Sequence, residues 1–513
     1  MQKVIEITMA PEELESETIL TNKLSTALKI DIIRIKGHQI LKRSIDARSR
    51  NVIYRLQVNV FIDQEPMAEN FTVNYQNVSN AKPVIIVGAG PAGLFAALQC
   101  IENGLKPIVL ERGKDVKQRR RDLAAINKQG IVNTESNYCY GEGGAGTYSD
   151  GKLYTRSNKR GDINKVLRAF VQHGATEDIL IDARPHIGTN KLPHIITAIR
   201  ETILNAGGEV HFDQKVTDIL VDFGKVKGAV INGENKLMAD AVILATGHSA
   251  RDIYELLHHK GILVEAKPFA LGVRIEHPQA IIDAAQYHCD IRSEFLPPAY
   301  YSLVEQVGSR GVFSFCMCPG GIIAPCATYE NEIVVNGWSP SKRNNPFANS
   351  GTVVQITLDD VKGDDPLRMM NFQAAIERSA FQLGGGNLVA PAQRMVDFVE
   401  GRLSMDLPKN SYLPGTNSVM LKDTLPDFVA SSLKNALPVF GKKMKGYYTN
   451  EAILVGVESR SSSPVRIPRD RDTFQHPQVS GLFPCAEGAG YAGGIVSAAI
   501  DGVNCANAIL KAI

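Results

Sequence analysis

Three glycines near residue 90 have the spacing that seats a dinucleotide. Gly88, Gly90 and Gly93 form G-x-G-x-x-G directly after the apolar run VIIV. The first glycine permits a tight turn, the second lets the backbone approach a pyrophosphate, and the third allows the following helix to pack closely on the strand. Free N–H groups and the positive end of the helix dipole then face the phosphates. We therefore expect Pro91 and Ala92, at the start of this helix, to contact the pyrophosphate.

An acidic residue completes the pattern. The strand PIVLE ends at Glu111, roughly twenty residues past the glycines, where a carboxylate accepts hydrogen bonds from ribose hydroxyls. The same charge repels a 2′-phosphate, which argues against NADP at this site. Arg112 follows it and is also expected to bind the cofactor. Because strand, helix, strand and acid are in register, a tight turn without a ligand is the weaker alternative.

A second set of glycines lies close to the last residue. Gly488, Gly490 and Gly493 repeat the spacing, but a second dinucleotide unit needs a helix, a strand and an acid about twenty positions further on. The sequence ends at Ile513, so we expect no such unit. The segment instead predicts a short strand ending at Glu487 and a helix. The N–H groups at the start of that helix suit the edge of a flavin where reduction accumulates negative charge.

These features resemble the two-part FAD sites of the glutathione-reductase superfamily. Those sites combine a glycine motif ending in Glu, a strand ending in A-T-G and a late strand–acid–glycine–helix segment, and the chain is similar over residues 83–250 and 451–513. The resemblance implies one FAD. It also implies cofactor contacts from Val216, whose backbone would meet adenine, and from Thr246, Gly247, Glu487, Gly488, Gly493, Gly494 and Ile495.

Five further segments resemble a narrower family. GEGGAGTYSDGKL, GVRIEHPQ, FSFCMCPGG, NNPFANS and GVESRSSSPVRIPRD together look like bacterial FAD-dependent dehydrogenases that carry a small N-terminal domain and have no assigned substrate. By analogy, the first of these segments lies along the pyrophosphate, with Gly144, Gly146 and Ser149 near the flavin. Lys152 would stabilise negative charge on reduced flavin. The alternative is a surface lysine paired with Asp150.

Cysteines and arginines supply further candidates. C-x-C places Cys316 and Cys318 on one face of a strand. Thiolate metal sites usually need four ligands, so we expect no metal there. Buried thiols lining a pocket are the first interpretation, and a thiol acting on substrate or flavin is the second. Arg460 and Arg466 suit a carboxylate or phosphate on a substrate, or else form ion pairs across a domain junction.

The elements around these residues predict an α/β fold with four parts. Residues 1–80 predict a small α+β domain, ferredoxin-like in outline, and residues 81–265 the first part of a Rossmann-like FAD-binding domain. Strand-like and then helical patterns over 266–450 predict an inserted mixed β-sheet and helical domain that roofs the flavin. Residues 451–513 predict the second part of the discontinuous FAD-binding domain.

Composition limits the classes of partner. The chain is 44% hydrophobic and 21% charged, with net charge +2, which gives no general case for nucleic acid or membrane binding. We find no run of 18 apolar residues, no signal-peptide pattern at the acidic start, and no framework spacing among the eight cysteines. The predicted compartment is therefore the cytoplasm. The run KDVKQRRRD, residues 114–122, is expected to be a solvated helix face.

The sequence thus predicts an FAD-dependent oxidoreductase, a dehydrogenase or reductase, that transfers a hydride at flavin N5. The substrate is an unidentified small molecule, for which a carboxylate or phosphate is one candidate feature. Because a second complete fingerprint is absent, NADH or NADPH is expected at most as a transient reductant. Two alternatives stay open. The first is a flavoprotein that modifies RNA through the basic residues of 29–55, where few acidic residues are close in the sequence. The second is a flavin-binding regulatory protein without turnover.

Overall fold

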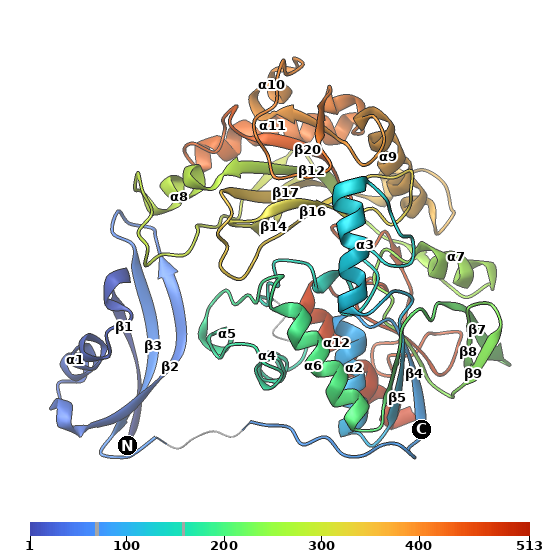
Figure 1. The fold of residues 1–513 in the computed structure, drawn as a ribbon, viewed down its shortest axis with the longest axis horizontal. Coiled ribbons are helices and arrows are strands. Elements are labelled where there is room, and N and C mark those ends of the chain that lie inside the picture. Colours follow the sequence, from blue (N-terminus) through green and yellow to red (C-terminus); the bar gives the residue numbers. More distant parts are fainter. Residues whose placement is uncertain (67–70, 156–159, 513) are drawn as a thin grey trace.

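The computed structural model describes residues 1–66, 71–155 and 160–512 (Figure 1). Its N-terminal part is a three-stranded antiparallel sheet in the order β1-β3-β2, covered by one helix. Tyr54, Leu56, Val58 and Val60 alternate along one strand and are buried, because a period of two places them on the face that the helix covers. The elements are β1 (Gln2–Met9), α1 (Glu17–Leu28), β2 (Ile35–Asp46) and β3 (Ile53–Ile62).

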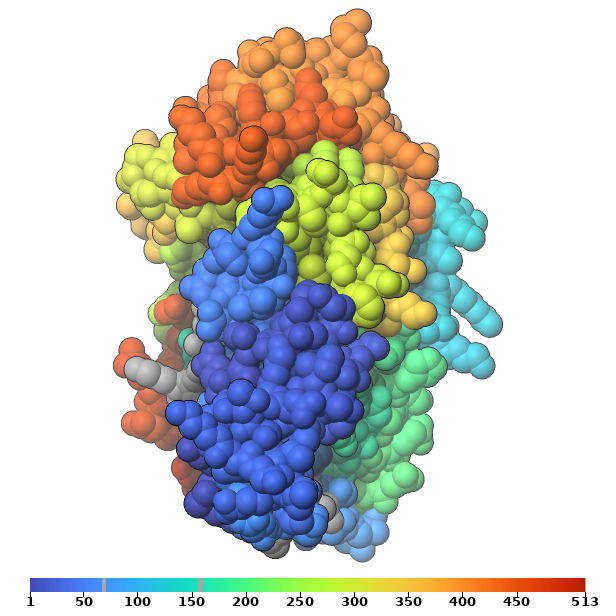
Figure 2. Space-filling model, turned by 90° about the vertical axis from the view of Figure 1, so that its left-hand side faces the viewer, coloured from blue at the N-terminus to red at the C-terminus, as the bar shows by residue number. Residues whose placement is uncertain are grey.

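This N-terminal part lies against the rest of the chain. Figure 2 shows it in blue, in contact with the segment near residue 290. Tyr54 Oη donates to the Phe295 carbonyl oxygen at 3.3 Å. Arg43 Nε lies 2.7 Å from an Asp182 carboxylate oxygen, so an ion pair joins β2 to the nucleotide-binding part.

A five-stranded parallel sheet forms the centre of the nucleotide-binding part, with strand order β22-β10-β4-β5-β6. Its strands are short apolar runs, because helices cover both faces of a parallel sheet. The last strand comes from the end of the chain, and pairs in parallel with β10. The strands are β4 (Pro83–Val87), β5 (Lys106–Leu110), β6 (Glu209–His211), β10 (Val242–Leu244) and β22 (Leu482–Pro484).

Helices α2 (Pro91–Glu102) and α12 (Ile495–Ala512) bring the two parts of this domain into contact. A Cβ on Gly502 would lie 2.1 Å from the carbonyl oxygen of Ala92, so the two backbones approach as closely as glycine permits. Within the described residues, α12 alone is long and apolar enough to cross a membrane by composition. However, 67% of its residues are buried inside the protein, so this helix belongs to the core.

The remaining elements of this part surround the central sheet. A three-stranded antiparallel sheet consists of β7 (Val216–Asp222), β8 (Lys225–Ile231) and β9 (Asn235–Met238). The helices are α3 (Val116–Gln129), α4 (Ile163–Gln172), α5 (Asp178–Ile181), α6 (Leu192–Asn205) and α7 (Arg251–His259).

A seven-stranded mixed sheet, in the order β13-β14-β17-β12-β20-β18-β19, lies above the nucleotide-binding part (Figure 1). Its strands are β12 (Phe269–Pro278), β13 (Val304–Val307), β14 (Arg310–Cys318), β17 (Phe347–Ile356), β18 (Ala390–Arg394), β19 (Thr416–Ser418) and β20 (Ile453–Glu458). The helices of this part are α8 (Gln279–Tyr287), α9 (Arg368–Gly384), α10 (Met395–Glu400) and α11 (Asp427–Lys443). Two small strand pairs are β15 (Ile322–Pro325) with β16 (Val335–Trp338), and β11 (Glu265–Ala266) with β21 (Val465–Arg466).

The fold class predicted from the sequence is confirmed, and one boundary differs. We expected the inserted part to end at residue 450, but β20 pairs with β12 and β18 of the inserted sheet. The sheet therefore extends to Glu458. An apolar strand followed by a glycine-rich segment does not reveal which of two sheets the strand joins.

Candidate functional site

A large cavity lies between the carboxyl ends of the parallel strands and the inserted sheet. Its volume, open mouth included, is about 1850 Å³. Its lining comes from β4, α2, β5, β14, β16 and α12 and from the loops that follow the parallel strands.

Most residues selected from the sequence line this cavity. They are Gly88, Gly90, Pro91, Ala92, Glu111, Arg112, Gly144, Gly146, Ser149, Lys152, Val216, Thr246, Gly247, Cys316, Arg460, Glu487, Gly494 and Ile495. Gly93, Gly488, Gly493, Cys318 and Arg466 are not part of the lining.

The turn between β4 and α2 has the geometry that its glycines predict. Gly88 has φ +104°, a conformation that costs glycine little. A Cβ on Gly93 would lie 1.9 Å from the Gly88 carbonyl oxygen, so only glycine allows the helix to start so close to the strand. The first intrahelical bond runs from Leu94 N to Gly90 O, and the preceding N–H groups have no partner within the helix. They are available to a pyrophosphate.

Glu111 is buried at the end of β5 and organises this turn. Its carboxylate accepts from the N–H groups of Ala89 at 2.9 Å, Gly113 at 2.8 Å and Gly141 at 2.9 Å. A carboxylate offers about four acceptor positions, which leaves one for a ribose hydroxyl. Glu111 thus has a second role, in joining three loops, which the sequence did not reveal.

Arg119 holds the glycine-rich loop that follows α3. Its side chain is wholly buried, and it donates to the carbonyl oxygens of Asn137, Tyr138, Glu142 and Gly144 at 2.8 to 2.9 Å. The expectation that residues 114–122 form only a solvated face is therefore wrong at this position. Val116, Leu123 and Ile126 are also buried, and this helical spacing was the signal for an inward-facing arginine.

The N-terminus of α12 faces the same cavity. Glu487 lies 3.2 Å from Nδ1 of His248, and both residues line the cavity. Gly494 has φ +90°, and a Cβ there would meet no atom within 4 Å. The backbone before the helix is therefore accessible, and the free N–H groups of its first turn can meet an electron-rich ring edge.

Together these features fit a flavin dinucleotide. Two helix N-termini lie at one cavity, one suited to a pyrophosphate and the other to the ring. A Cβ on Gly247 would also meet nothing within 4 Å, so the backbone there leaves open space. A Cβ on Gly90 would meet only the Cα of Gly144, at 3.8 Å.

Lys152 joins the nucleotide-binding part to the inserted sheet. Its Nζ lies 3.7 Å from Cys316 Sγ and 3.8 Å from Cys318 Sγ, and it also donates to the Met317 carbonyl oxygen. Burial alone would lower the pKa of Lys152, but the two cysteines and Asp150 raise it above its usual value. The alternative interpretation of Lys152 was a surface lysine paired with Asp150. Asp150 lies 4.0 Å from Nζ, so this ion pair is weak.

A buried ion pair lies behind the cysteines, and the sequence did not identify it. Arg274 Nη1 is 3.0 Å from a Glu458 carboxylate oxygen, and both side chains are almost fully buried. Arg274 Nη2 donates to the Cys316 carbonyl oxygen at 2.8 Å and lies 3.4 Å from Cys318 Sγ. Burial raises the pKa of Glu458 to about 7, although Arg274 opposes the shift. Glu458 lines the cavity.

The arginine-rich segment after β20 does not act as one anion site. Arg460 Nη2 is 2.9 Å from Glu377, and Arg251 is 2.6 Å from the same carboxylate. Because Glu377 engages its guanidinium, the ion-pair alternative applies to Arg460. Arg466 is exposed, with its guanidinium 5.7 Å from the centre of the Tyr491 ring. Of the two interpretations left open by the sequence, the structure favours the ion pair at Arg460 and does not place Arg466 in the cavity lining.

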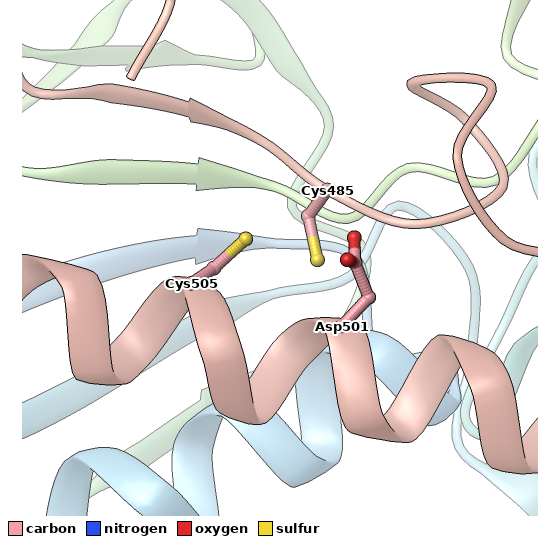
Figure 3. Close-up of side chains that lie close together, drawn as sticks. All are labelled: Cys485, Asp501 and Cys505. Carbon is pink, nitrogen blue, oxygen red and sulfur yellow. The ribbon is translucent and has the colours of Figure 1, made fainter. Parts of the chain in front are cut away.

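Cys485, Asp501 and Cys505 form a further cluster, between β22 and α12 (Figure 3). The Asp501 carboxylate is already engaged, because Arg469 Nη2 lies 2.7 Å from it and the Ala486 N–H donates to it at 2.6 Å. The Arg469–Asp501 pair therefore joins the segment before β22 to α12, and the cluster is structural.

Four arginines of residues 29–55 have acidic partners, more than the sequence suggested. Arg34 pairs with Asp63, Arg43 with Asp178 and Asp182, and both Arg48 and Arg55 with Asp46. Two of these acids, Asp178 and Asp182, lie more than a hundred positions away along the chain, which is why the sequence suggested an unpaired patch.

Three family comparisons cover most of the chain. Residues 82–255 match the family described as pyridine nucleotide-disulphide oxidoreductase. Residues 268–461 match the family described as FAD-dependent protein, C-terminal domain-like. Residues 1–61 match a domain family of unknown function.

Two relatives match longer stretches of the chain than any single family does. A protein of Clostridium beijerinckii described as "Uncharacterized protein" is 42% identical over 513 residues and covers 96% of each chain. The FAD-dependent monooxygenase notI' of Aspergillus versicolor is 25% identical over 297 residues, with 56% of this chain and 60% of that protein covered. Among solved structures, a geranylgeranyl bacteriochlorophyll reductase-like protein of Thermoplasma acidophilum is 14% identical. It covers 84% of this chain and 79% of that one, with a TM-score of 0.36.

The cofactor that the cavity fits is FAD, in agreement with the family matches. With its relative in Clostridium beijerinckii, the chain belongs to a family of FAD-dependent oxidoreductases.

Proposed function

We propose that the protein is an FAD-dependent dehydrogenase, which removes two electrons from a small substrate bound between the flavin and the inserted sheet. One observation carries the proposal. A single cavity extends from the dinucleotide turn at Gly88 and Gly90, past the start of α12, to Lys152 and Cys316 in the roof. A substrate in its upper part is therefore enclosed next to the reactive edge of the ring.

When bound, FAD supplies an electrophilic ring that accepts a hydride at N5. The chain's own groups hold the charge that accumulates there. The N–H groups at the start of α12 stabilise negative charge at the pyrimidine edge. Lys152 adds a full positive charge from the roof, where the inserted sheet limits access of water and strengthens its field. Glu458 supports proton exchange, because its raised pKa of about 7 allows both protonation states near neutral pH.

The same groups determine where an anionic group of the substrate would bind. Because Arg460 has an acidic partner and Arg466 lies outside the cavity lining, a carboxylate or phosphate would be held by Lys152. In the opposite direction, in which the small molecule is reduced, NADH or NADPH would bind transiently and supply the electrons to the flavin. We also propose that the protein acts in the cytoplasm.

The test is anaerobic stopped-flow mixing of the purified holoprotein with candidate organic substrates, NADH and NADPH. Bleaching of the flavin by an organic substrate supports the dehydrogenase. Reduction by a nicotinamide alone, with oxygen then incorporated into product, would instead indicate a monooxygenase, as the relative in Aspergillus versicolor is described. A flavin that no donor reduces would contradict the proposal.

Lys152→Met should slow flavin reduction about tenfold to a hundredfold and leave FAD bound. Lys117→Met, at an exposed lysine of α3, is the matched control and should keep the original rate. Equal rates in both variants would remove Lys152 from the charge-stabilising role.

A further inference from the structure

We propose that Cys316 and Cys318 are a redox-active dithiol that exchanges two electrons with the bound flavin, and that Cys316 is the sulfur that meets a thiol or disulfide substrate. The inference deepens the proposed function, on which it rests, by naming the substrate class. If the two cysteines only lined the cavity, their sulfurs would have no chemical role.

The first support is the placement of both sulfurs at one cation. Lys152 Nζ is 3.7 Å from Cys316 Sγ and 3.8 Å from Cys318 Sγ. Arg274 Nη2 approaches Cys318 Sγ to 3.4 Å from the other side. Two full positive charges at this distance stabilise a thiolate relative to a thiol. Buried thiols that only fill space need no such neighbours.

The second support is that the two sulfurs differ in access. Cys316 is partly exposed and lines the cavity, whereas Cys318 is wholly buried behind it. A reactive cysteine that can meet a substrate, with a buried cysteine that can displace the substrate from it, is the arrangement of a redox dithiol. The backbone contributes to this arrangement. Cys316 has φ +47°, and the pairing register shifts between Phe315 and Cys318, so β14 departs from a regular strand where the sulfurs lie.

Their acidities differ in the direction that this division requires. A hydrogen bond from the Cys318 thiol, assisted by Lys152 and Arg274, lowers the pKa of Cys316 well below its usual value despite burial. The same hydrogen bond, together with burial, raises the pKa of Cys318 well above its usual value. The pair therefore favours a thiolate at Cys316 and a thiol at Cys318.

The electron balance is simple. Oxidation joins the two sulfurs by one S–S bond, and the proton of Cys318 is released. A bound FAD would accept the two electrons together with a proton from solvent. The dithiol returns when a substrate dithiol attacks the Cys316 sulfur, Cys318 leaves as a thiol, and the second substrate sulfur then displaces Cys316. The net reaction oxidises a substrate dithiol to its disulfide.

Lys152 and Arg274 are positioning residues in this scheme, since they act through the sulfurs. Arg274 is itself held by Glu458 at 3.0 Å and by Asn349 Oδ1 at 2.8 Å. Its position is therefore fixed from two further strands of the roof.

The first experiment measures the thiolate directly, on protein with and without FAD. Iodoacetamide alkylation is followed residue by residue by mass spectrometry across pH 5 to 9. We expect Cys316 to react about tenfold faster than Cys289 at pH 7, because the larger thiolate fraction of Cys316 outweighs the lower intrinsic nucleophilicity of its thiolate. Cys289 is the control, since burial and nearby carboxylates raise its pKa. Lys152→Met should move the Cys316 profile to higher pH. A Cys316 rate that follows the Cys289 profile would overturn the proposal.

The second experiment counts electrons in the holoprotein. After anaerobic treatment with diamide and desalting, dithionite should deliver two more electrons per flavin to wild type and Cys289→Ser than to Cys316→Ser and Cys318→Ser. Peptide mapping should find a Cys316–Cys318 peptide lighter by two hydrogens. Dithiothreitol should bleach the flavin of wild type rapidly and that of Cys318→Ser slowly.

The outcomes separate this inference from the proposed function. If all variants bind FAD, organic substrates reduce it equally and no extra electrons appear, the dithiol is wrong and the dehydrogenase stands. Cys316 could instead be alkylated rapidly and form a disulfide with Cys318 while no donor reduces the flavin. That result would refute the proposed dehydrogenase activity and also the electron exchange between the dithiol and the flavin.

Discussion

Replacing Arg119 by methionine tests how the flavin site is built. The buried guanidinium donates four hydrogen bonds to loop carbonyls. Methionine has a similar length and no donor. Each buried carbonyl left without a charged donor costs about 1 to 3 kcal/mol, but the substitution also removes a cation that is costly to bury. We therefore expect a net loss of about 3 to 5 kcal/mol in the free energy of unfolding.

The same substitution should weaken FAD binding. Arg119 holds the carbonyl oxygen of Gly144, and a Cβ on Gly144 would lie 3.0 Å from the Cα of Gly90 in the dinucleotide turn. When the loop loses this anchor, two parts of the cofactor's cradle separate. Urea unfolding followed by circular dichroism gives the stability, and titration of FAD into the apoprotein gives the affinity.

Arg121→Met is the matched control, because Arg121 lies on the same helix and is exposed. Its stability should stay within about 0.5 kcal/mol of wild type. Arg119→Lys keeps the charge and some of the donors and should fall between the two. If Arg119→Met changed stability by less than about 1 kcal/mol, the four bonds would not hold the loop, and the reasoning would fail.

Further predictions concern the turn, the ion-pair network and the roof. Gly93→Ala should abolish FAD retention, because its Cβ would lie 1.9 Å from the Gly88 carbonyl oxygen. A flavin absorbance equal to wild type would refute this. Arg460→Met should cost about 3 to 5 kcal/mol in unfolding experiments, since Glu377 loses one of the two guanidinium groups that pair with it. A change below about 1 kcal/mol would return Arg460 to the list of candidate substrate contacts. Glu458 has its pKa raised from 4.5 to about 7, so the folded state binds the extra proton and this group's contribution to stability falls as pH rises from about 4.5 to 7. Glu458→Gln, compared with wild type by thermal unfolding at pH 5 and pH 8, should therefore gain up to about 3 kcal/mol relative to wild type at the higher pH. A difference independent of pH would contradict the shift.

The sequence was most informative where function requires a local geometry. The positions of Gly88 and Gly93 are set by contacts within six residues, so a spacing pattern identifies them. The late strand before Glu487 was also predicted in the right domain, because the structure pairs β22 with β10 of the central sheet. The contact of Glu487 with the flavin stays a prediction.

The sequence was least informative where a residue's role depends on a distant partner. Arg274 and Glu458 are separated by 184 positions, and nothing in either neighbourhood identifies the other. Arg460 appeared to belong to an arginine cluster, but its partner Glu377 comes from α9. Similarly, Arg43 had no evident partner in the sequence because Asp178 and Asp182 belong to another part of the chain. Charge counts within a segment therefore overestimate the number of free cations.

The roof of the cavity departs from what stability alone favours. Burying the charged groups of Arg274, Glu458 and Lys152 costs several kcal/mol for each ion. A protein with well-packed apolar residues at these positions would often be at least as stable. The adjacent strands show that such packing is available, since Val273, Ile275, Val353 and Val354 fill the core of the same sheet. Buried charges surround the two sulfurs, and one of the two cysteines, Cys316, has positive φ. This combination indicates selection for a chemical property of those sulfurs. That reasoning predicts an asymmetry between variants. Replacing Arg274 and Glu458 together by methionine and leucine should preserve or raise thermal stability, while the alkylation rate of Cys316 at pH 7 falls toward that of Cys289. If both stability and alkylation were unchanged, the charges would be incidental to the sulfurs.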